Sequence, residues 1–471
     1  MGRMAKAICE DNLDNGNARA DVGISFCVYL VTLGCDKNRV DSEVMLARLV
    51  STRCFTPVTD PIRADVIIVN TCGFIREATQ ESIDTILEMA AYKSDPDASC
   101  RALIVTGCMS ERYRDDAKAA IPEADAILGV KDTDAIVQVV FELLGEEMPA
   151  PASDKSGGDA GQLRALSRAY AYAGHVAHVK ISDGCNNACT YCTIPSIRGA
   201  YISRTMEDIV AECEVLLNTG ARELVLVAQD TALYGIDLYG TPRLHELMRA
   251  LAALPGNPWI RLMYAYPEHI TPEIIQAIAE LPNVCKYIDM PIQHSETSVL
   301  RRMGRKSTKE GLLSLISELR AKIPGIALRT TLIVGFPGET VENFRALYNF
   351  VKEVGFDRLG VFPYSREEGT PAAMLAQQVK EEVKHTRRDR LMRLQQRIHQ
   401  AKQQAKTGQS ICVIVDESLE SDEYIGRTQH DAYEVDAVVR FTSAVPLNPG
   451  DIVQVSITDA DEYDLQGVLT Q

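Results

Sequence analysis

The sequence predicts an α/β protein with three folded parts. They are a parallel α/β domain, a central βα barrel that is partial or complete, and a small antiparallel β-barrel at the carboxyl end. Short apolar runs alternate with segments of helical period over residues 25–147. Six further strand-and-helix units follow over residues 164–376. Five short strands separated by turns occupy residues 406–471, which is typical of a small closed barrel.

Length and composition agree with a folded protein of several domains. The chain has 471 residues, of which 46% are hydrophobic and 24% charged. No run approaches the ~18 apolar residues that cross a bilayer, and the first residues lack the apolar core of a secretory signal. The odd count of 13 cysteines argues against a disulfide framework. We therefore expect a cytoplasmic protein, not associated with membranes, whose reduced thiols bind metal or take part in catalysis.

The amino-terminal region begins with residues 1–24, which we interpret as a flexible extension, and continues as an α/β domain over residues 25–147. Its strands are expected in the apolar runs FCVYLVTL, ADVIIVNTC and RALIVTGC. Helical periodicity predicts helices over Asp41–Val50 and Glu77–Ala91. Strand and helix in alternation indicate a parallel sheet.

A cysteine stands at the end of each of these three strands: Cys35, Cys72 and Cys108. The carboxyl ends of parallel strands meet at one edge of a sheet, where ligands collect in open α/β folds. We therefore expect the three thiols to converge although they are far apart in the sequence. Each cysteine taken alone is equally well explained as a buried thiol that packs at a strand end.

A linker and a second α/β domain follow. Residues 148–163 are rich in Pro, Ala, Ser, Gly and Asp, which is typical of a linker. Strands over residues 164–376 are expected in AHVKISDGC, ELVLVAQD, WIRLMYAYP, YIDMPIQH, IALRTTLIVGFP and RLGVFPYS. Polar residues and glycines cluster just after these strands, at the face where βα barrels carry their chemistry.

The carboxyl-terminal third contains a helix and a small barrel. Residues 377–405 keep helical spacing and are strongly basic, which we interpret as a solvated helix that connects two domains. Residues 406–471 contain the strands SICVIVDES, EYIGRTQ, DAVVRFT, DIVQVSITDA and DLQGVLTQ. Strands this short and this closely spaced favour a small β-barrel.

The segment GCNNACTYC carries the most specific pattern in the chain. Cys185, Cys189 and Cys192 form a Cys-x3-Cys-x2-Cys loop. Three thiolates at this spacing can hold three irons of a 4Fe–4S cluster and leave the fourth iron open to a substrate or cofactor. Zinc is the alternative metal, although structural zinc usually takes four ligands.

This loop at the start of a βα barrel resembles the radical S-adenosylmethionine (SAM) superfamily, and Tyr191 stands at the aromatic position of the motif. The resemblance implies that the open iron binds SAM, that reduction cleaves SAM to a 5′-deoxyadenosyl radical, and that Tyr191 belongs to the cofactor site. Four polar residues at strand ends or within a strand are further candidates for contact with the cofactor: Gln229, Asp230, Gln293 and Arg329.

Nearly the whole chain after residue 25 resembles the methylthiotransferases. Cys35, Cys72 and Cys108 lie in LGCDKNRVDSE, NTCGFIREATQES and VTGCMSER, and the terminal barrel resembles a TRAM domain. The resemblance implies that these three cysteines hold a second, auxiliary 4Fe–4S cluster that handles sulfur. It also implies an electron donor such as flavodoxin or ferredoxin.

Two bacterial branches of this family differ in substrate. AQDTALYG, RLMYAYP and HDAYEVDAVV resemble the RimO-like branch, which adds a methylthio group to the β-carbon of an aspartate in protein twelve of the small ribosomal subunit. MPIQH and IVGFPGET occur in both branches and do not discriminate. The chain departs from the RimO-like pattern at Tyr433, usually Pro, and at Ala437, usually Gly. The alternative is the MiaB-like branch, which modifies an adenosine in transfer RNA.

Charge supports the protein substrate. The formal net charge is −16, and −11 of it lies in the block from Gly408 onward. Nucleic-acid binding needs cationic residues, so direct binding of nucleic acid is unlikely, whereas a basic ribosomal protein fits an acidic barrel. The charge is also compatible with a role in solubility alone. An alternative of another class is an iron–sulfur ribosome- or RNA-binding factor without turnover.

Overall fold

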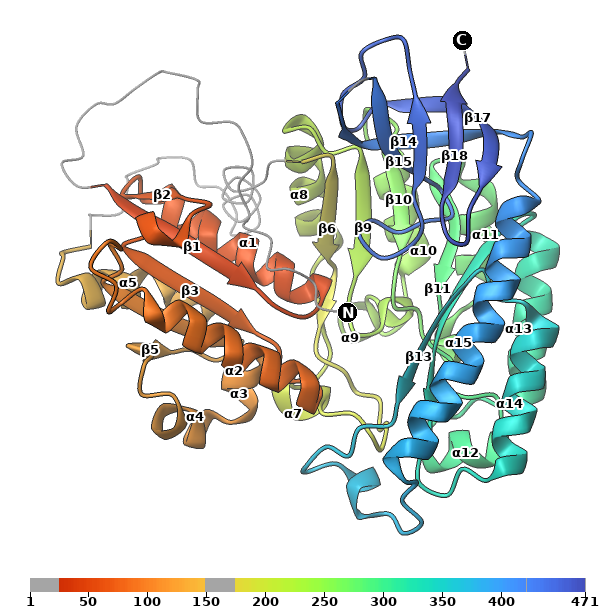
Figure 1. Cartoon of the computed structure of the whole chain (residues 1–471), viewed down its shortest axis with the longest axis horizontal. Coiled ribbons are helices and arrows are strands. Elements are labelled where there is room, and N and C mark those ends of the chain that lie inside the picture. The colour runs from red at the N-terminus through yellow and green to blue at the C-terminus, as the bar shows by residue number, and fades with distance from the viewer. Residues whose placement is uncertain (1–24, 149–173, 421, 471) are drawn as a thin grey trace.

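The computed structural model describes residues 25–148, 174–420 and 422–470 in the arrangement shown in Figure 1. The predicted extension, residues 1–24, and all but the first residue of the predicted linker lie outside the described residues. The described chain forms an amino-terminal α/β domain, a central sheet covered by helices, and a carboxyl-terminal barrel that lies against one end of that sheet (Figure 1). No helix among the described residues has the length and apolar character that crossing a membrane requires.

The amino-terminal domain is a parallel five-stranded sheet in the order β2-β1-β3-β4-β5. Alternate residues of β1 face opposite sides: Leu30 joins a cluster under α1 and α5, and Val31 joins a cluster under α2. Both faces are therefore buried, which explains why the strands are almost wholly apolar. The elements are β1 (Phe26–Thr32), α1 (Asp36–Ser51), β2 (Phe55–Pro57), η1 (Pro61–Arg63), β3 (Val66–Thr71), α2 (Arg76–Ala91), β4 (Ala102–Gly107), α3 (Cys108–Arg112), α4 (Arg114–Ala120), β5 (Ala126–Ile127), η2 (Thr133–Ala135) and α5 (Ile136–Leu144).

The central part contains six parallel strands in the order β13-β12-β11-β10-β9-β6. Strands β6 and β13 are the two edges, so the sheet is a partial barrel. Its six strands coincide with the six predicted units. They are β6 (Val176–Lys180), β9 (Glu223–Val227), β10 (Trp259–Leu262), β11 (Val284–Asp289), β12 (Ala327–Val334) and β13 (Arg358–Pro363).

Helices cover the outer face of this sheet and bury one large apolar cluster against it. The long ones are α8 (Met206–Asn218), α10 (Leu244–Ala252), α11 (Pro272–Glu280), α13 (Lys309–Lys322) and α14 (Val341–Val354). Short elements shape the loops at the carboxyl ends of the strands, and these build the candidate site. They are β7 (Ser182–Asp183), α7 (Ile194–Arg198), β8 (Ile202–Ser203), η3 (Thr231–Leu233), α9 (Ile236–Tyr239), η4 (Pro267–His269), α12 (Thr297–Arg302) and η5 (Pro371–Met374).

The carboxyl-terminal strands close a barrel in the order β14-β15-β16-β18-β17, as predicted. Four of its pairings are antiparallel, but β16 and β18 run parallel, which differs from the antiparallel barrel expected. The reason is geometric, because an odd number of strands cannot alternate in direction around a closed ring. The strands are β14 (Ser410–Ser418), β15 (Glu423–Thr428), β16 (Val439–Thr442), β17 (Ile452–Ala460) and β18 (Leu465–Leu469).

Two helices differ from the sequence prediction. Helix α1 begins at Asp36, immediately after Cys35, and not at Asp41. Its first turn is polar yet buried against the central part, so hydrophobic periodicity could not reveal it. The predicted connecting helix is α15 (Glu381–Gln404), and it is not solvated all round. Leu391 and Leu394 pack into the central core, so α15 also covers the sheet edge at β13.

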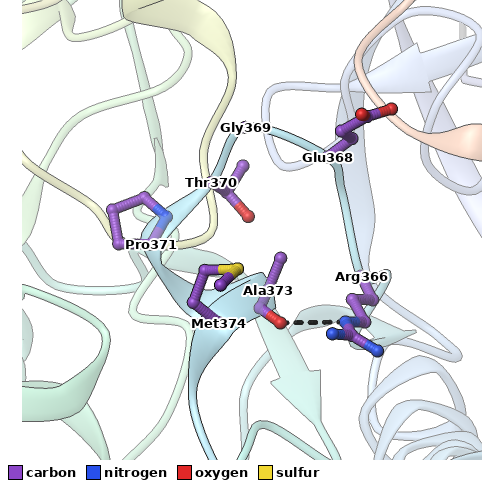
Figure 2. A pocket seen from close by; sticks show the side chains of 7 residues that line it. All are labelled: Arg366, Glu368, Gly369, Thr370, Pro371, Ala373 and Met374. Atoms are coloured by element: carbon purple, nitrogen blue, oxygen red, sulfur yellow. Dashed lines mark hydrogen bonds between the residues drawn. The ribbon is translucent and has the colours of Figure 1, made fainter.

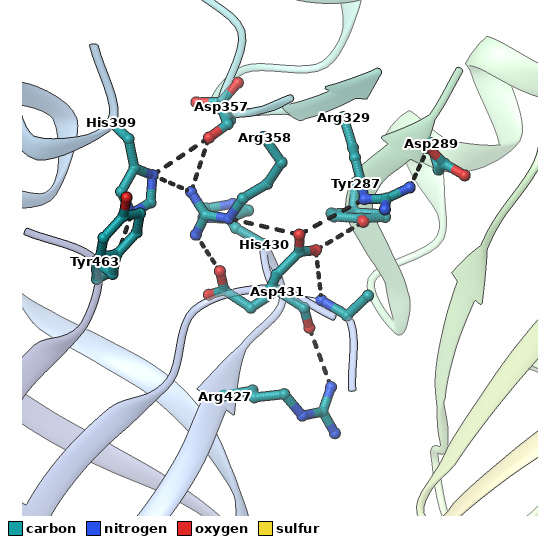
Figure 3. A network of polar contacts seen from close by, with 12 residues as sticks. Tyr287, Asp289, Arg329, Asp357, Arg358, His399, Arg427, His430, Asp431 and Tyr463 are labelled. Atoms are coloured by element: carbon teal, nitrogen blue, oxygen red, sulfur yellow. Dashed lines mark hydrogen bonds and ion pairs between the residues drawn. The ribbon is translucent and has the colours of Figure 1, made fainter. Parts of the chain in front are cut away.

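All three parts of the chain meet in one apolar cluster. It combines Val44 of α1, Trp259 and Tyr287 of the central strands, and Ile414 and Ala432 of the barrel. Buried ion pairs surround this cluster on the barrel side. Arg358 pairs with Asp431, and Arg329 pairs with Asp289 at 2.7 Å (Figure 3). The barrel is therefore a fixed part of the fold.

Candidate functional site

A glycine sets the course of the loop that carries Cys185, Cys189 and Cys192. Gly184 has φ +75°, and a Cβ there would lie 2.0 Å from the carbonyl oxygen of Ala200. Only glycine therefore permits this close approach of two backbone segments. The Cys185 amide donates to the Gly199 carbonyl at 3.1 Å, and the Cys192 amide donates to the Cys189 carbonyl at 3.1 Å. The loop is thus folded by its own backbone.

The three sulfurs of this loop receive hydrogen bonds suited to thiolates. The amides of Asn187 and Ile194 donate to the sulfurs of Cys185 and Cys192, both at 3.4 Å. The Tyr266 hydroxyl lies against the Cys189 sulfur. Burial raises the pKa of Cys192 to about 12. A metal ion deprotonates a coordinating thiol outright, so these donors and this buried setting fit a sulfur-bound iron cluster.

A second layer of side chains holds this loop in place. The Arg305 guanidinium lies 3.6 Å from the centre of the Tyr266 ring and also pairs with Glu268. Asp230, fully buried, accepts hydrogen bonds from Asn187 at 3.1 Å and from His269 at 2.7 Å. The loop is therefore braced from two sides, by the strand end after β10 and by the strand end after β9.

Three predicted cofactor residues have buried oxygens that find no hydrogen-bond partner among the residues that the structure describes. These are Oε1 of Gln229, Oδ1 of Asp230 and Oε1 of Gln293. Gln293 also has φ +68°, an unusual value for a residue other than glycine. Unpaired buried acceptors are rare in folded proteins and strained residues gather at functional sites. The three residues therefore fit a ligand that brings its own donors, as the amino group of SAM does.

Two other predicted cofactor residues have different surroundings. The Tyr191 ring makes an edge contact with Phe336, with ring centroids 6.5 Å apart, beside the cysteine loop. Arg329 donates to Asp289 at 2.7 Å and lies 3.6 Å from Asp436 of the carboxyl-terminal barrel. The carboxylates of Asp289 and Asp436 thus balance the positive charge of Arg329. A contact between Arg329 and the cofactor stays a prediction.

The amino-terminal cysteines follow three adjacent strands and lie at one edge of their sheet. Cys35 precedes α1, Cys72 follows β3, and Cys108 begins α3. The Cys108 sulfur lies 3.5 Å from Oδ1 of Asn38 in the first turn of α1. A Cβ at Gly34 would lie 2.8 Å from the Cys72 sulfur. The strand ends thus bring the three thiols into one neighbourhood, as the parallel sheet predicts.

Burial raises the pKa of two of these thiols, Cys72 and Cys108. Desolvation raises the pKa of Cys72 to about 12, with smaller contributions from Cys35 and Cys108 nearby. Among the described residues, no three His, Cys, Asp or Glu side chains gather closely enough to hold a single metal ion. A 4Fe–4S cluster makes a different demand, because each cysteine sulfur holds its own iron and the ligands are therefore spaced more widely.

Sequence reasoning missed the residues that join the two cysteine sites. Arg198 and Lys180 both contact Asp41 and Asp183, and Arg198 reaches Cys108. Nothing in the local sequence marks them as a junction, since Asp41 and Cys108 lie in another domain. Tyr266 stood within the quoted string RLMYAYP, but its contact with Cys189 follows only from the fold.

A cavity of about 500 Å³ lies in the loop after β13, between Arg366 and Met374 (Figure 2). This loop is tied to both cysteine sites. The Ala372 amide donates to the Thr190 carbonyl at 2.9 Å, within the cysteine loop. Glu367 pairs with Arg112 of α3, the helix that Cys108 begins, at 2.8 Å. The loop that lines the cavity therefore contacts both predicted cysteine sites.

Three family models match the chain. The Radical SAM superfamily matches residues 179–351, the Uncharacterized protein family UPF0004 matches residues 27–129, and the TRAM domain matches residues 407–469. A solved structure similar to this chain is the radical S-adenosylmethionine methyltransferase TsrM from Kitasatospora setae with cobalamin and a [4Fe-4S] cluster bound. It has a TM-score of 0.50 and 15% identity over 74% of each chain, a likeness of fold alone.

Curated relatives match almost the full length. A ribosomal protein uS12 methylthiotransferase RimO from Clostridioides difficile (strain 630) is 47% identical over 440 residues, 93% of this chain and 98% of the relative. Its counterpart from Desulforamulus reducens (strain ATCC BAA-1160 / DSM 100696 / MI-1) is 48% identical over 448 residues, 94% of this chain and 99% of the relative. These near-full-length matches, together with the radical SAM region, show that the chain belongs to the RimO family of radical SAM methylthiotransferases.

Proposed function

We propose that this enzyme adds a methylthio group to the β-carbon of an aspartate in ribosomal protein uS12. One observation supports the proposal: Arg198, six residues after Cys192, donates to the Cys108 sulfur and to Asp41 of the amino-terminal domain, and so connects the two predicted cysteine sites. The substrate follows from relatives that are 47–48% identical, which are ribosomal protein uS12 methylthiotransferases.

Each cysteine triplet has its own part in this proposal. Cys185, Cys189 and Cys192 would hold the cluster that binds SAM, and Cys35, Cys72 and Cys108 would hold the second 4Fe–4S cluster. The bound groups supply reductive cleavage of SAM to a 5′-deoxyadenosyl radical and a source of sulfur, chemistry that an unactivated C–H bond requires because it has no acidic proton. Flavodoxin or ferredoxin is the class of electron donor that we propose.

The chain's own residues orient these groups and exclude water. Asn187 and Ile194 donate to two of the loop sulfurs through their amides. Asp230 is fully buried, and its Oδ1 has no hydrogen-bond partner among the described residues. Such fixed dipoles need no reorganisation during the reaction. Gln229, Asp230 and Gln293 are the residues that we propose to contact SAM, together with Tyr191.

The acidic surface of the barrel supports a basic protein as partner, although it is smaller than the sequence suggested. Asp416, Asp431 and Asp436 pair with arginines inside the molecule. The exposed acidic side chains that remain available to a partner include Glu417, Glu420, Asp422, Glu423, Asp459, Asp461 and Glu462. Charge complementarity of this kind steers association with a basic protein.

The test is modification of defined substrates by the reconstituted enzyme. Incubation with SAM and reductant should add a methylthio mass to uS12 and leave transfer RNA unchanged. Modification of transfer RNA alone would contradict the proposed substrate. If no 5′-deoxyadenosine forms although both clusters are intact, the result would instead favour a binding factor without turnover.

The Cys35→Ala variant tests the division of labour between the two sites. We expect SAM cleavage to persist and methylthiolation to be lost, because only the second cluster loses a ligand. Iron and sulfide should be about eight of each per wild-type chain, from two four-iron clusters. A Cys35→Ala protein that still methylthiolates uS12 would show that the second site is assigned wrongly.

A further inference from the structure

The side chain of Arg198 lies between the two cysteine sites. Arg198 is the last residue of α7, the short helix that begins two residues after Cys192. Its side chain is 2% exposed. Burial of a charge is strongly unfavourable unless the charge is paired, so the burial of Arg198 needs a physical reason.

The guanidinium makes contacts in two directions. Nη1 donates to Asp41 of α1 and to Asp183 of β7, both at 2.9 Å. Nη2 donates to Oδ1 of Asn38 at 2.7 Å and to the sulfur of Cys108 at 3.5 Å. The guanidinium of Arg198 therefore connects β7, which leads into the radical SAM loop, with the start of α1, the helix that follows Cys35.

Lys180 completes a closed group of charges. Its ammonium pairs with Asp183 at 2.8 Å and with Asp41. Two cations thus face two carboxylates, so the cluster of side chains is neutral as a whole. Of the two cations, Arg198 is the one that donates to the Cys108 sulfur. Its guanidinium has several N–H groups in fixed directions, so it can bind the carboxylates and the sulfur at the same time.

The hydrogen bond from Arg198 to the Cys108 sulfur has a different role when that sulfur binds a metal. A thiol can donate to Asn38, at 3.5 Å. A metal-bound sulfur is a thiolate and has no proton to donate, and Arg198 then remains as its charged donor. Hydrogen bonds and positive charge at cluster sulfurs stabilise the reduced, more negative state, which raises the reduction potential.

We infer that Arg198 is a positioning residue for the methylthio-transfer reaction. It fixes the separation of the two cysteine sites, and its hydrogen bond to Cys108 raises the reduction potential of the cluster held by Cys35, Cys72 and Cys108. The inference rests on the proposed function, because it takes these three cysteines as cluster ligands. It goes beyond that function in assigning a role to a residue that holds no iron.

The test isolates the second cluster. Replacing Cys185, Cys189 and Cys192 by alanine in the full chain removes the radical SAM site, so that a potentiometric titration followed by electron paramagnetic resonance reports one cluster. In this background we compare Arg198→Met, which loses charge and donor, with Arg198→Gln, which loses the charge only. We expect the ratio of reduced to oxidised cluster at a given potential to fall about tenfold in Arg198→Met, about 59 mV for one electron.

Arg204→Met in the same background is the matched control. Arg204 is also buried and pairs with two carboxylates, Asp208 at 2.6 Å and Glu212, and it donates to the Lys180 carbonyl rather than to a cysteine sulfur. Its potential should equal that of the background protein. Arg198→Gln should also lower the potential, by less than Arg198→Met.

Three results have distinct meanings. Potentials that are unchanged in Arg198→Met or in Arg198→Gln would overturn the inference and leave the proposed function standing. A fall of equal size in Arg204→Met would also overturn it, because the effect would then follow from loss of any buried arginine. A triple-alanine protein that binds no cluster would overturn the second-cluster assignment itself.

Discussion

Glu223 joins the central sheet to the carboxyl-terminal barrel, and its loss is the sharpest test of that junction. It is the first residue of β9 and is fully buried. Its carboxylate accepts from Arg261 of β10 at 2.5 Å and from Arg427 of β15 at 2.7 Å. The substitution Glu223→Gln keeps the shape and leaves two buried guanidinium groups short of a negative charge.

The expected loss can be worked from the structure. Burial raises the pKa of Glu223, but Arg261 and Arg427 outweigh it and lower the pKa from 4.5 to about 2, which corresponds to about 3 kcal/mol in favour of the folded carboxylate. Removing one partner of a buried ion pair typically destabilises by roughly 3–5 kcal/mol. We therefore expect Glu223→Gln to lower the free energy of unfolding of this junction by about 3 kcal/mol at neutral pH.

The pH dependence has a definite sign. Because the folded pKa of Glu223 lies below the unfolded one, its contribution to stability is fully present above pH 4.5 and is lost as the pH falls toward 2. Wild-type protein and Glu223→Gln should therefore differ most at neutral pH and converge in acid. A difference that grew on acidification would contradict the ion-pair reasoning.

The single tryptophan provides the assay. Trp259 is 4% exposed and packs in the cluster that contains Ile414 and Ala432 of the barrel. Its emission maximum in a denaturant titration thus reports separation of barrel and sheet. The control is Glu280→Gln, since Glu280 pairs with Arg249 on the surface, with side chains 48% and 44% exposed. Such an exposed pair is screened by solvent and contributes little to stability, and equal midpoints for both variants would refute the reasoning.

Three further substitutions have expected outcomes, two at single contacts and one at the acidic surface of the barrel. Gly107→Ala places a Cβ 2.3 Å from Oδ1 of Asn70 at φ +101°, so iron and sulfide analysis should show loss of about half the iron, with SAM cleavage retained. Tyr266→Phe removes the hydroxyl that faces Cys189. Redox titration should therefore show a lower reduction potential for the radical SAM cluster and an unchanged reduction potential for the second cluster. Replacing Glu420 and Glu423 by lysine should weaken binding of basic uS12 at low salt, with little effect at high salt, as measured by calorimetry.

Local pattern was enough to predict most of the fold and both cysteine sets. Six parallel strands and five barrel strands lie where apolar runs and turn residues predict them. Cys35, Cys72 and Cys108 could be grouped because parallel strands end at one edge of a sheet. The start of α1 could not be predicted, since Asp36 and its neighbours are buried by contact with another domain.

The sequence by itself determined which class of chemistry this protein supports. The reason is that two features are local properties of the chain: the spacing of Cys185, Cys189 and Cys192, and the order of strands and helices. The tertiary structure alone decided which charges remain free. Asp431 and Asp422 look alike in a charge count, yet the first is buried against Arg358 and the second is exposed. Arg198 reaches Cys108 across 90 residues of sequence. Such pairings depend on how whole domains dock, and no short-range pattern in the chain encodes that geometry.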